Sequence, residues 1–98
     1  MKYELIKSDV FTKKAGKLLK RNPEFIPLLS NVLITLKEYP FSPTLKTHKL
    51  KGNLRNSYAC SLNYEYRIIF KILYNFQLES STENVIYLET IGTHDEVY

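Results

Sequence analysis

The sequence predicts an α+β domain in which two N-terminal helices pack on a twisted antiparallel sheet, in the order β-α-α-β-β-β. Two observations lead to this fold class. Apolar residues recur at helical spacing in two adjacent N-terminal segments, and they alternate with polar residues in several C-terminal segments. The 98 residues suffice for a single domain, residues 1–98, with one modest core.

A short strand and two helices are expected in the N-terminal half. The strand covers residues 3–6. Ser8 is a good N-cap for a helix over residues 9–20, because its hydroxyl can accept a bond from an unpaired backbone N–H. Asn22 as the cap and Pro23 as the first residue open a second helix that should end near residue 38, and Pro27 should delay its start or produce a kink. The short link indicates a helical hairpin that packs on the sheet.

Residues 63–73 are expected to form the strand around which the sheet is built. Alternate side chains of a strand point to opposite faces, so the apolar set of this segment should meet the core. The other face carries Glu65, Arg67, Ile69 and Lys71. Packing does not require a row of charged side chains, whereas binding of a polyanion does, so this face is a candidate binding surface.

The neighbouring strand is expected over residues 55–62. A two-residue turn at residues 63–64 would join it to the central strand, and the resulting register gives the pairs Cys60–Arg67 and Tyr58–Ile69. A shift by one residue would reverse which side chains share a face. Residues 84–91 should form the last strand, after a polar connection over residues 74–84. The final four residues should form a turn or an extended end.

Residues 40–52 are expected to form a basic loop that Leu45 and Leu50 anchor to the body. The loop places one histidine, His48, among several lysines. A histidine on a well-positioned loop is a plausible part of a functional site, and the alternative is a solvated loop residue.

Charge is distributed unevenly along the chain. Residues 1–71 hold all 14 Lys and Arg residues and five of the ten acidic residues, a net charge of +9, whereas residues 72–98 have a net charge of −5. This asymmetry favours a nucleic-acid or acidic-protein partner, and a solvated basic face would explain it equally well.

Composition argues against several classes of protein. No apolar run is long enough to cross a bilayer, and the N-terminus lacks the apolar region of a secretory signal, so a cytoplasmic protein without membrane contact is expected. Cys60 is expected to be a small buried apolar residue rather than a nucleophile. Neither a Gly-rich phosphate loop nor a zinc-ligand spacing is present, so no metal and no cofactor are expected.

Four polar residues from separate segments are candidates for a catalytic site, namely His48, Glu65, Arg67 and His94. They converge if the last strand lies beside the central one. Such a set suits RNA cleavage by attack of the 2′-hydroxyl on the adjacent 3′-phosphate, which needs a base, an acid and a cation for the developing phosphate charge. The simpler interpretation is a surface ion pair and a chain-end histidine. Candidate RNA contacts are Lys49, Lys51, Arg55, Tyr66, Lys71 and Tyr98.

Two stretches resemble the RelE/ParE superfamily of toxins from type II toxin–antitoxin pairs. Residues 48–72 contain a His-x-Leu-x-Gly loop, and residues 86–94 end in Gly-Thr-His. The similarity extends over essentially the whole chain and is greatest to RelE-like mRNA interferases of the YafQ and YoeB kind. It implies a RelE-like fold and an endoribonuclease that cleaves mRNA, usually in the A site of the 70S ribosome. It also implies inhibition by a cognate antitoxin protein.

The resemblance also implies roles for single residues. His48 stands where YafQ-like toxins keep a catalytic histidine, and Glu65 where they keep an active-site aspartate. Arg67 matches the catalytic arginine of YoeB-like toxins, and His94 the histidine near the C-terminus that is the expected general acid. Ser61 departs from the YafQ-like pattern, which has a further histidine there, so either Arg67 replaces its role or the activity is lowered.

Two other functions fit the same resemblance. A ParE-like toxin inhibits DNA gyrase by binding and needs neither histidine. A non-catalytic member of the fold would bind nucleic acid or an acidic antitoxin, and the Ser61 departure favours this possibility. His48 and His94 favour the interferase. In each case, the antitoxin is expected to cover the basic face or the helical hairpin with an acidic or amphipathic segment.

Overall fold

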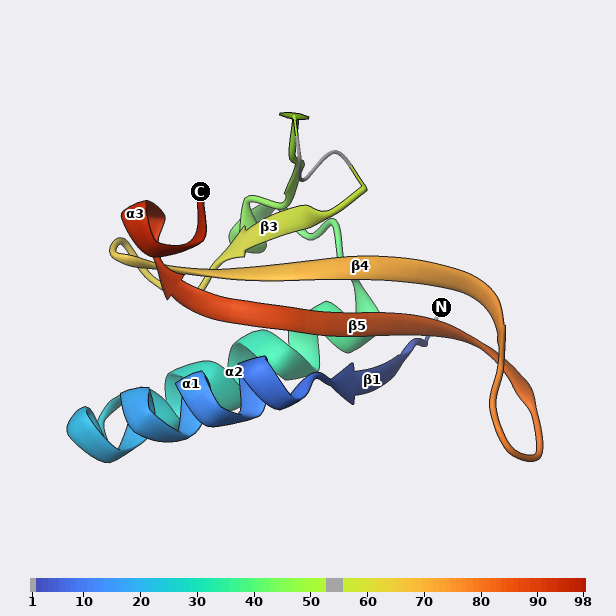
Figure 1. The fold of residues 1–98 in the computed structure, drawn as a ribbon, viewed down its shortest axis with the longest axis horizontal. Helices are drawn as coiled ribbons and strands as arrows, with labels where there is room; N and C mark the ends of the chain where they lie inside the picture. The colour runs from blue at the N-terminus through green and yellow to red at the C-terminus, as the bar shows by residue number, and fades with distance from the viewer. Residues whose placement is uncertain (1, 53–55) are drawn as a thin grey trace.

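The computed structural model describes residues 2–52 and 56–98. Five strands form one sheet in the order β1-β5-β4-β3-β2, and two long helices cover one of its faces (Figure 1). The strands are β1 (Glu4–Lys7), β2 (His48–Lys49), β3 (Tyr58–Ser61), β4 (Tyr66–Gln77) and β5 (Thr82–Thr93). The helices are α1 (Asp9–Arg21), α2 (Phe25–Glu38) and α3 (His94–Val97), with a 3-10 turn η1 at Pro43–Leu45. The predicted fold class is confirmed.

The direction of β1 differs from the antiparallel expectation. β1 pairs in parallel with β5, with Glu4 opposite Val85 and Lys7 opposite Leu88, so the sheet is mixed. Side chains alternate in the same way in parallel and antiparallel strands, and the sequence pattern therefore does not reveal the direction of pairing.

Helix α1 begins at the predicted cap. The Ser8 hydroxyl accepts a bond from the Phe11 N–H at 2.9 Å and donates one to the Glu89 carbonyl at 2.7 Å, so the cap also attaches the helix to β5. The predicted start of the second helix, Pro23, is wrong by two residues, because α2 begins at Phe25 after a backbone turn. Pro27 therefore lies in the first helical turn, where its missing N–H costs no helical hydrogen bond and a kink is not required.

The turn between β3 and β4 corrects the predicted register. Leu62 and Tyr66 close a three-residue loop, and the Asn63 side-chain oxygen accepts the N–H groups of Glu65 and Tyr66 at 3.0 and 2.8 Å. Glu65 is consequently a turn residue rather than a strand residue. The observed pairs are Cys60–Ile68, Ser61–Arg67 and Tyr58–Phe70, one residue away from the predicted Cys60–Arg67 and Tyr58–Ile69.

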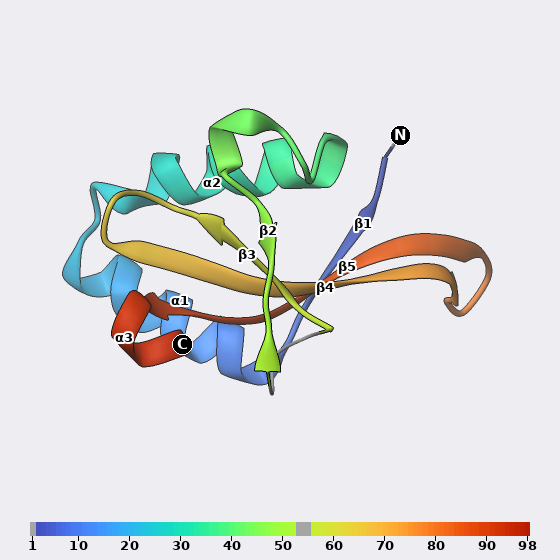
Figure 2. The same cartoon turned by 90° about the horizontal axis from the view of Figure 1, so that it is seen from above.

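The hairpin of β4 and β5 is longer than predicted, because residues 74–84 continue the two strands beyond the expected connection. An irregularity after Leu73 interrupts the ladder, where Asn75 has a φ of 54° and its N–H bonds to the Asn84 side chain at 3.1 Å. The far end of the hairpin projects beyond the rest of the sheet (Figures 1 and 2).

The basic loop over residues 40–52 is more regular than predicted. It contains η1 and the two-residue strand β2, which pairs with β3. Leu45 is buried in the core as expected, whereas Leu50 is half-buried. The Thr47 hydroxyl donates to the Pro40 carbonyl at 2.5 Å and holds the two ends of the η1 segment together. The loop therefore presents His48 from a fixed strand.

The core lies between the sheet and the two long helices. The largest buried side chains include Phe11 of α1, Leu36 of α2 and Phe70 of β4. Cys60 is buried in this core as predicted, and burial raises the pKa of its thiol to about 12, which keeps it protonated and unreactive. Ile69 is also buried, on the opposite face, so the expected row of exposed charges is interrupted. No helix in the described ranges is long and apolar enough to span a membrane.

Candidate active site at the end of the central hairpin

A capping box joins the end of β5 to α3. The Thr93 N–H donates to Glu96 Oε1 at 2.7 Å, and the Thr93 hydroxyl accepts the Glu96 N–H at 3.4 Å. The pKa of the Glu96 carboxyl is lowered, first by the Thr93 backbone bond, then by its side-chain bond, with Lys14 adding to the effect. The chain end, expected as a turn or an extended segment, is thus a short helix, and it fixes where His94 and Tyr98 lie.

Gly92 allows α3 to approach the sheet. A Cβ atom at this position would lie 3.0 Å from Glu96 Oε1 and 3.1 Å from Val97 Cγ1, closer than ordinary contacts. The Gly-Thr-His stretch that the sequence singled out therefore has a physical explanation. Glycine permits the contact, threonine caps the helix and histidine is its first residue.

Replacement of Gly92 by Ala is expected to displace α3 and to lower activity, with a loss of free energy of unfolding of about 1 kcal/mol. The matched control is Gly16→Ala in α1, where nothing lies within 4 Å of the added methyl group. That change should raise stability by about 0.5–1 kcal/mol, because alanine favours a helix. Urea unfolding and the chemical shifts of His94 measure both effects. Unchanged His94 shifts in Gly92→Ala would contradict the role of glycine in placing α3.

Tyr98 connects the two histidines, which come from distant parts of the sequence. Its hydroxyl lies 3.3 Å from His48 Nε2, and its ring meets the His94 ring edge-on at a centroid distance of 4.4 Å. The pKa of the Tyr98 phenol is raised, chiefly by burial, and the Arg67 guanidinium opposes this shift. The predicted convergence of His48 and His94 is therefore observed, with Tyr98 between them.

The backbone orients the imidazole of His48. Its Nδ1 lies 3.1 Å from the Lys46 carbonyl, which can only accept a hydrogen bond, so Nδ1 carries the proton of that bond. In the neutral ring, Nε2 then has a free lone pair and can accept the Tyr98 hydroxyl. Lys46 itself has a left-handed φ of 53°. The arrangement leaves Nε2 of an exposed histidine as a possible proton acceptor.

Arg67 lies beside the turn that precedes β4. Its Nη1 donates to the carbonyls of Asn63, Tyr64 and Tyr66 at 2.9–3.1 Å, so one end of the guanidinium is fixed. Within the described residues, its Nε and Nη2 groups remain available to a ligand. Arg67 lines an open hollow of about 500 Å³ together with Tyr64, Glu65, Thr93, His94 and Asp95. The hollow thus combines a guanidinium, carboxylates and an imidazole, and His94 Nδ1 lies 3.6 Å from Asp95 Oδ1.

The structure places the predicted RNA contacts differently. Lys49 and Lys51 are exposed near His48, and Tyr98 lies in the site itself. Tyr66 points to the helix side of the sheet, away from Arg67, and Arg55 lies outside the described residues. Ser61 pairs with Arg67 across the β3–β4 ladder.

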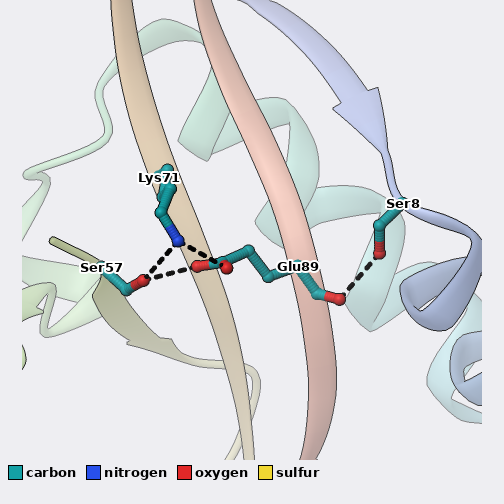
Figure 3. A network of polar contacts seen from close by, with 4 residues as sticks. All are labelled: Ser8, Ser57, Lys71 and Glu89. Carbon is teal, nitrogen blue, oxygen red and sulfur yellow. Dashed lines mark hydrogen bonds and ion pairs between the residues drawn. The ribbon is translucent and has the colours of Figure 1, made fainter. Parts of the chain in front are cut away.

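Lys71 is already engaged with protein groups. Its ammonium contacts Glu89 Oε2 at 2.7 Å and Ser57 Oγ at 3.2 Å, and Ser57 donates to Glu89 Oε1 at 2.5 Å (Figure 3). This network joins β4, β5 and the residue before β3. The Glu89 carbonyl also accepts from Ser8, so one residue connects three parts of the fold. Lys71 is therefore a structural residue rather than a free phosphate ligand.

A β-bulge places Glu89 in this network. Ile69 and Phe70 of β4 pair with Thr90 and Leu88 of β5, so Glu89 is the extra residue between them. Neither Ser57 nor Glu89 is predicted from the sequence, because alternation alone does not reveal a bulge. The available signal is an acidic residue inside a largely apolar strand.

Replacement of Glu89 by Ala is expected to lower the free energy of unfolding by about 2 kcal/mol, since it leaves the Lys71 ammonium and the Ser57 hydroxyl without their acceptor. Partial solvent access to Lys71 keeps the cost below that of a fully buried ion pair. Glu79→Ala, at the exposed tip of the hairpin, is the control and should change stability by less than about 0.5 kcal/mol. If urea unfolding gave the same free energy of unfolding for Glu89→Ala and Glu79→Ala, the network would not stabilise the fold.

The chemistry of the site follows from its side chains. Two imidazoles can transfer protons, and one guanidinium can bind a phosphate with a planar pair of donors. No cluster of three or more His, Cys, Asp or Glu side chains suited to a metal ion occurs in residues 2–52 or 56–98. The groups present suit acid–base chemistry at a phosphate.

No protein-family model and no curated protein sequence matches the chain, but solved structures do. A metal-bound toxin from Helicobacter pylori is 28% identical, with full coverage of both chains and a TM-score of 0.73. The E. coli DinJ–YafQ toxin–antitoxin complex matches with 18% identity over 100% of this chain and 99% of the other, at a TM-score of 0.72. A YoeB/ParE toxin from Agrobacterium tumefaciens matches with 14% identity over 93% of this chain and 98% of the toxin, at a TM-score of 0.74. The resemblance in fold predicted from the sequence is therefore confirmed, and the chain has the RelE-like fold seen in the YafQ and YoeB/ParE toxins.

Proposed function

We propose that this protein is the toxin of a type II toxin–antitoxin pair and that it cleaves mRNA by internal attack of the 2′-hydroxyl. The observation that carries the proposal is the placement of His48 and His94 on either side of Tyr98, at the end of the hairpin that also carries Arg67. The fold alone does not distinguish an interferase from a gyrase inhibitor. Two histidines and an arginine at one site favour proton transfer at a phosphodiester.

The side chains suggest a division of roles. His48 Nε2 would take the proton from the 2′-hydroxyl, since its Nδ1 is held by a carbonyl. The 2′-oxygen then bonds to phosphorus while the bond from phosphorus to the 5′-oxygen breaks, and His94 would donate a proton to that leaving oxygen. Arg67 would stabilise the charge on the phosphoryl oxygens through its free N–H groups. Glu65, exposed beside Arg67, would orient His94 or serve as an alternative base.

The substrate and the partner follow from the same proposal. The exposed Lys49 and Lys51, next to His48, would hold the RNA backbone, with cutting expected in the ribosomal A site in the cytoplasm. One structural neighbour was solved as a toxin–antitoxin complex. We expect a cognate antitoxin that covers the basic surface of this chain with an acidic segment.

Induced expression, followed by mapping of mRNA 5′ ends with and without a translation block, tests the proposal. Cuts within reading frames that disappear when translation stops are expected. Cuts that persist would indicate a ribonuclease that acts on free RNA. Growth arrest with intact mRNA and accumulated gyrase–DNA complexes would reject the proposal in favour of gyrase inhibition.

A further inference from the structure

A second hollow lies between α1 and α3, on the helix side of the sheet. We call it the α1–α3 pocket. It has a volume of about 280 Å³ and is lined by Lys14, Lys17, Arg21, Tyr66, Gly92 and Glu96, among others. In the described part of the chain, β1 pairs with β5 only as far as Leu88, so no strand covers the final residues of β5 at this edge. Helix α1 runs beside them instead (Figures 1 and 2).

The lining of this pocket holds three cations and one carboxylate, that of Glu96. Lys14, Lys17 and Arg21 follow one another at helical spacing on α1 and share a face. Within residues 2–52 and 56–98, no carboxylate lies within 4.0 Å of their charged nitrogens, in contrast to Lys71 with its partner Glu89. Glu96, the acid of the pocket, already accepts the Thr93 N–H. The pocket therefore has a net positive charge that is available to an anion.

An aromatic and two aliphatic residues also line the pocket, with Asn22 as a further polar residue. Tyr66 is the aromatic residue, and its ring makes an edge-on contact with Phe25 at a centroid distance of 5.9 Å. Leu18 and Ile91 add apolar surface. A cationic side facing an aromatic and aliphatic side is the combination that binds a nucleotide, since it provides for both the phosphate and the base.

The α1–α3 pocket adjoins the candidate active site. Tyr66 lines the pocket and the next residue, Arg67, lines the active-site hollow. Likewise, Gly92 lines the pocket and Thr93 lines the active-site hollow. Only the sheet edge and the first turn of α3 therefore separate the two hollows. A single-stranded RNA with its cleaved phosphate at Arg67 would pass this edge.

We propose that the α1–α3 pocket is a second nucleotide subsite, which binds a phosphate and base of the RNA substrate away from the cleaved bond. The inference rests on the proposed function for the identity of the ligand. Lys17 and Arg21 would contact the phosphate, and Tyr66 would contact the base. The subsite would make affinity depend on RNA length, because a dinucleotide at the active site does not reach it.

The test compares two charge-neutralising pairs on the same helix. Lys17→Gln/Arg21→Gln alters the α1–α3 pocket and leaves Lys14, which influences Glu96 and hence α3, in place. Lys13→Gln/Lys20→Gln removes the same charge from exposed residues outside the pocket lining. Fluorescence anisotropy measures binding of a 2′-O-methyl hexanucleotide and of the corresponding dinucleotide, both of which resist 2′-hydroxyl attack, at several salt concentrations.

The pocket pair is expected to weaken hexanucleotide binding about tenfold and to reduce the slope of log affinity against log salt by about 0.7–1.4, corresponding to one or two phosphate contacts. The control pair should weaken hexanucleotide binding less than threefold. Dinucleotide binding should be unchanged in both double variants. Equal losses in the two pairs would mean a general charge effect and would overturn the proposal.

Two other occupants of the pocket are distinguished by the same variants. Binding of a nucleoside monophosphate that the pocket pair abolishes, with unchanged hexanucleotide affinity, would assign the pocket to free nucleotides and overturn the proposal. Loss of antitoxin binding with unchanged RNA affinity would assign it to the protein partner and overturn it as well. Binding is measured with probes that cannot be cut, and cleavage is measured separately with unmodified mRNA. Pocket-dependent RNA binding without cleavage of unmodified mRNA by the wild-type protein would refute the proposed function, whereas the α1–α3 pocket would remain an RNA-binding site.

Discussion

Replacement of Arg67 by Ala is expected to reduce RNA cleavage by about two to three orders of magnitude. Removal of a single donor to a developing oxyanion has an effect of this size in other enzymes, and Arg67 is the cation of the active-site hollow. Arg67→Lys should retain part of the activity, since it keeps the charge but not the planar pair of donors. Single-turnover cleavage of a defined mRNA on ribosomes measures both variants.

Arg67 also binds the carbonyls of the turn before β4, so a structural explanation must be tested separately. Asn63→Ala removes the side-chain bonds that shape the same turn and leaves the guanidinium in place. It should lower stability by about 1 kcal/mol and activity by less than tenfold. Equal losses of activity in Asn63→Ala and Arg67→Ala, with similar unfolding curves, would show that Arg67 acts only by holding the turn.

Replacement of either His48 or His94 by Ala is expected to lower the cleavage rate by about two to four orders of magnitude, as for the loss of a general acid or base. The two variants should differ in their pH dependence. Loss of the base removes the acidic limb of a bell-shaped profile, and loss of the acid removes the alkaline limb. We expect His48→Ala to show the first change and His94→Ala the second.

Tyr98→Phe provides the matched control for the histidines. It removes the hydroxyl that lies 3.3 Å from His48 Nε2 and keeps the ring that contacts His94. A reduction of less than tenfold with an unchanged pH profile is expected, because the phenol orients His48 without transferring its proton. If Tyr98→Phe lost activity as completely as His48→Ala, the phenol itself would be the proton-transferring group.

The sequence is sufficient for the elements whose signals are local. The Ser8 cap and the apolar stripes predict α1 and most of α2, and alternation predicts the central strand. Arg67 and His94 meet once β5 lies beside β4, and the pairing of β2 with β3 adds His48. These features depend on the spacing of neighbouring residues, which the sequence displays directly.

The errors arise where one side chain or one extra residue determines the geometry. The Asn63 side chain stabilises a three-residue loop in place of a two-residue turn, and this shifts the β3–β4 register by one position. The bulge at Glu89 changes which face of the sheet the following side chains of β5 occupy, and Glu89 itself forms an ion pair with Lys71. Alternation reveals neither feature, so the pattern assigns Lys71 to RNA although the protein already engages it.

The α1–α3 pocket depends on a contact that neither segment reveals alone. The basic residues of α1 have the pattern of an ordinary solvated face, and Tyr66 that of a core residue of β4. Only the close approach of α3, which Gly92 permits, encloses them in one hollow. The missing information is therefore the tertiary placement of distant segments.

The most direct test of the proposed chemistry is the identity of the RNA ends produced by the purified protein on programmed ribosomes. Attack by the 2′-hydroxyl leaves a 2′,3′-cyclic phosphate on the upstream fragment and a 5′-hydroxyl on the downstream fragment, and mass spectrometry distinguishes these from other ends. We expect the cyclic phosphate with the wild-type protein and its loss in Arg67→Ala. A 5′-phosphate on the downstream fragment, or mRNA left intact by the purified wild-type protein, would contradict the proposed catalytic roles of His48, Arg67 and His94.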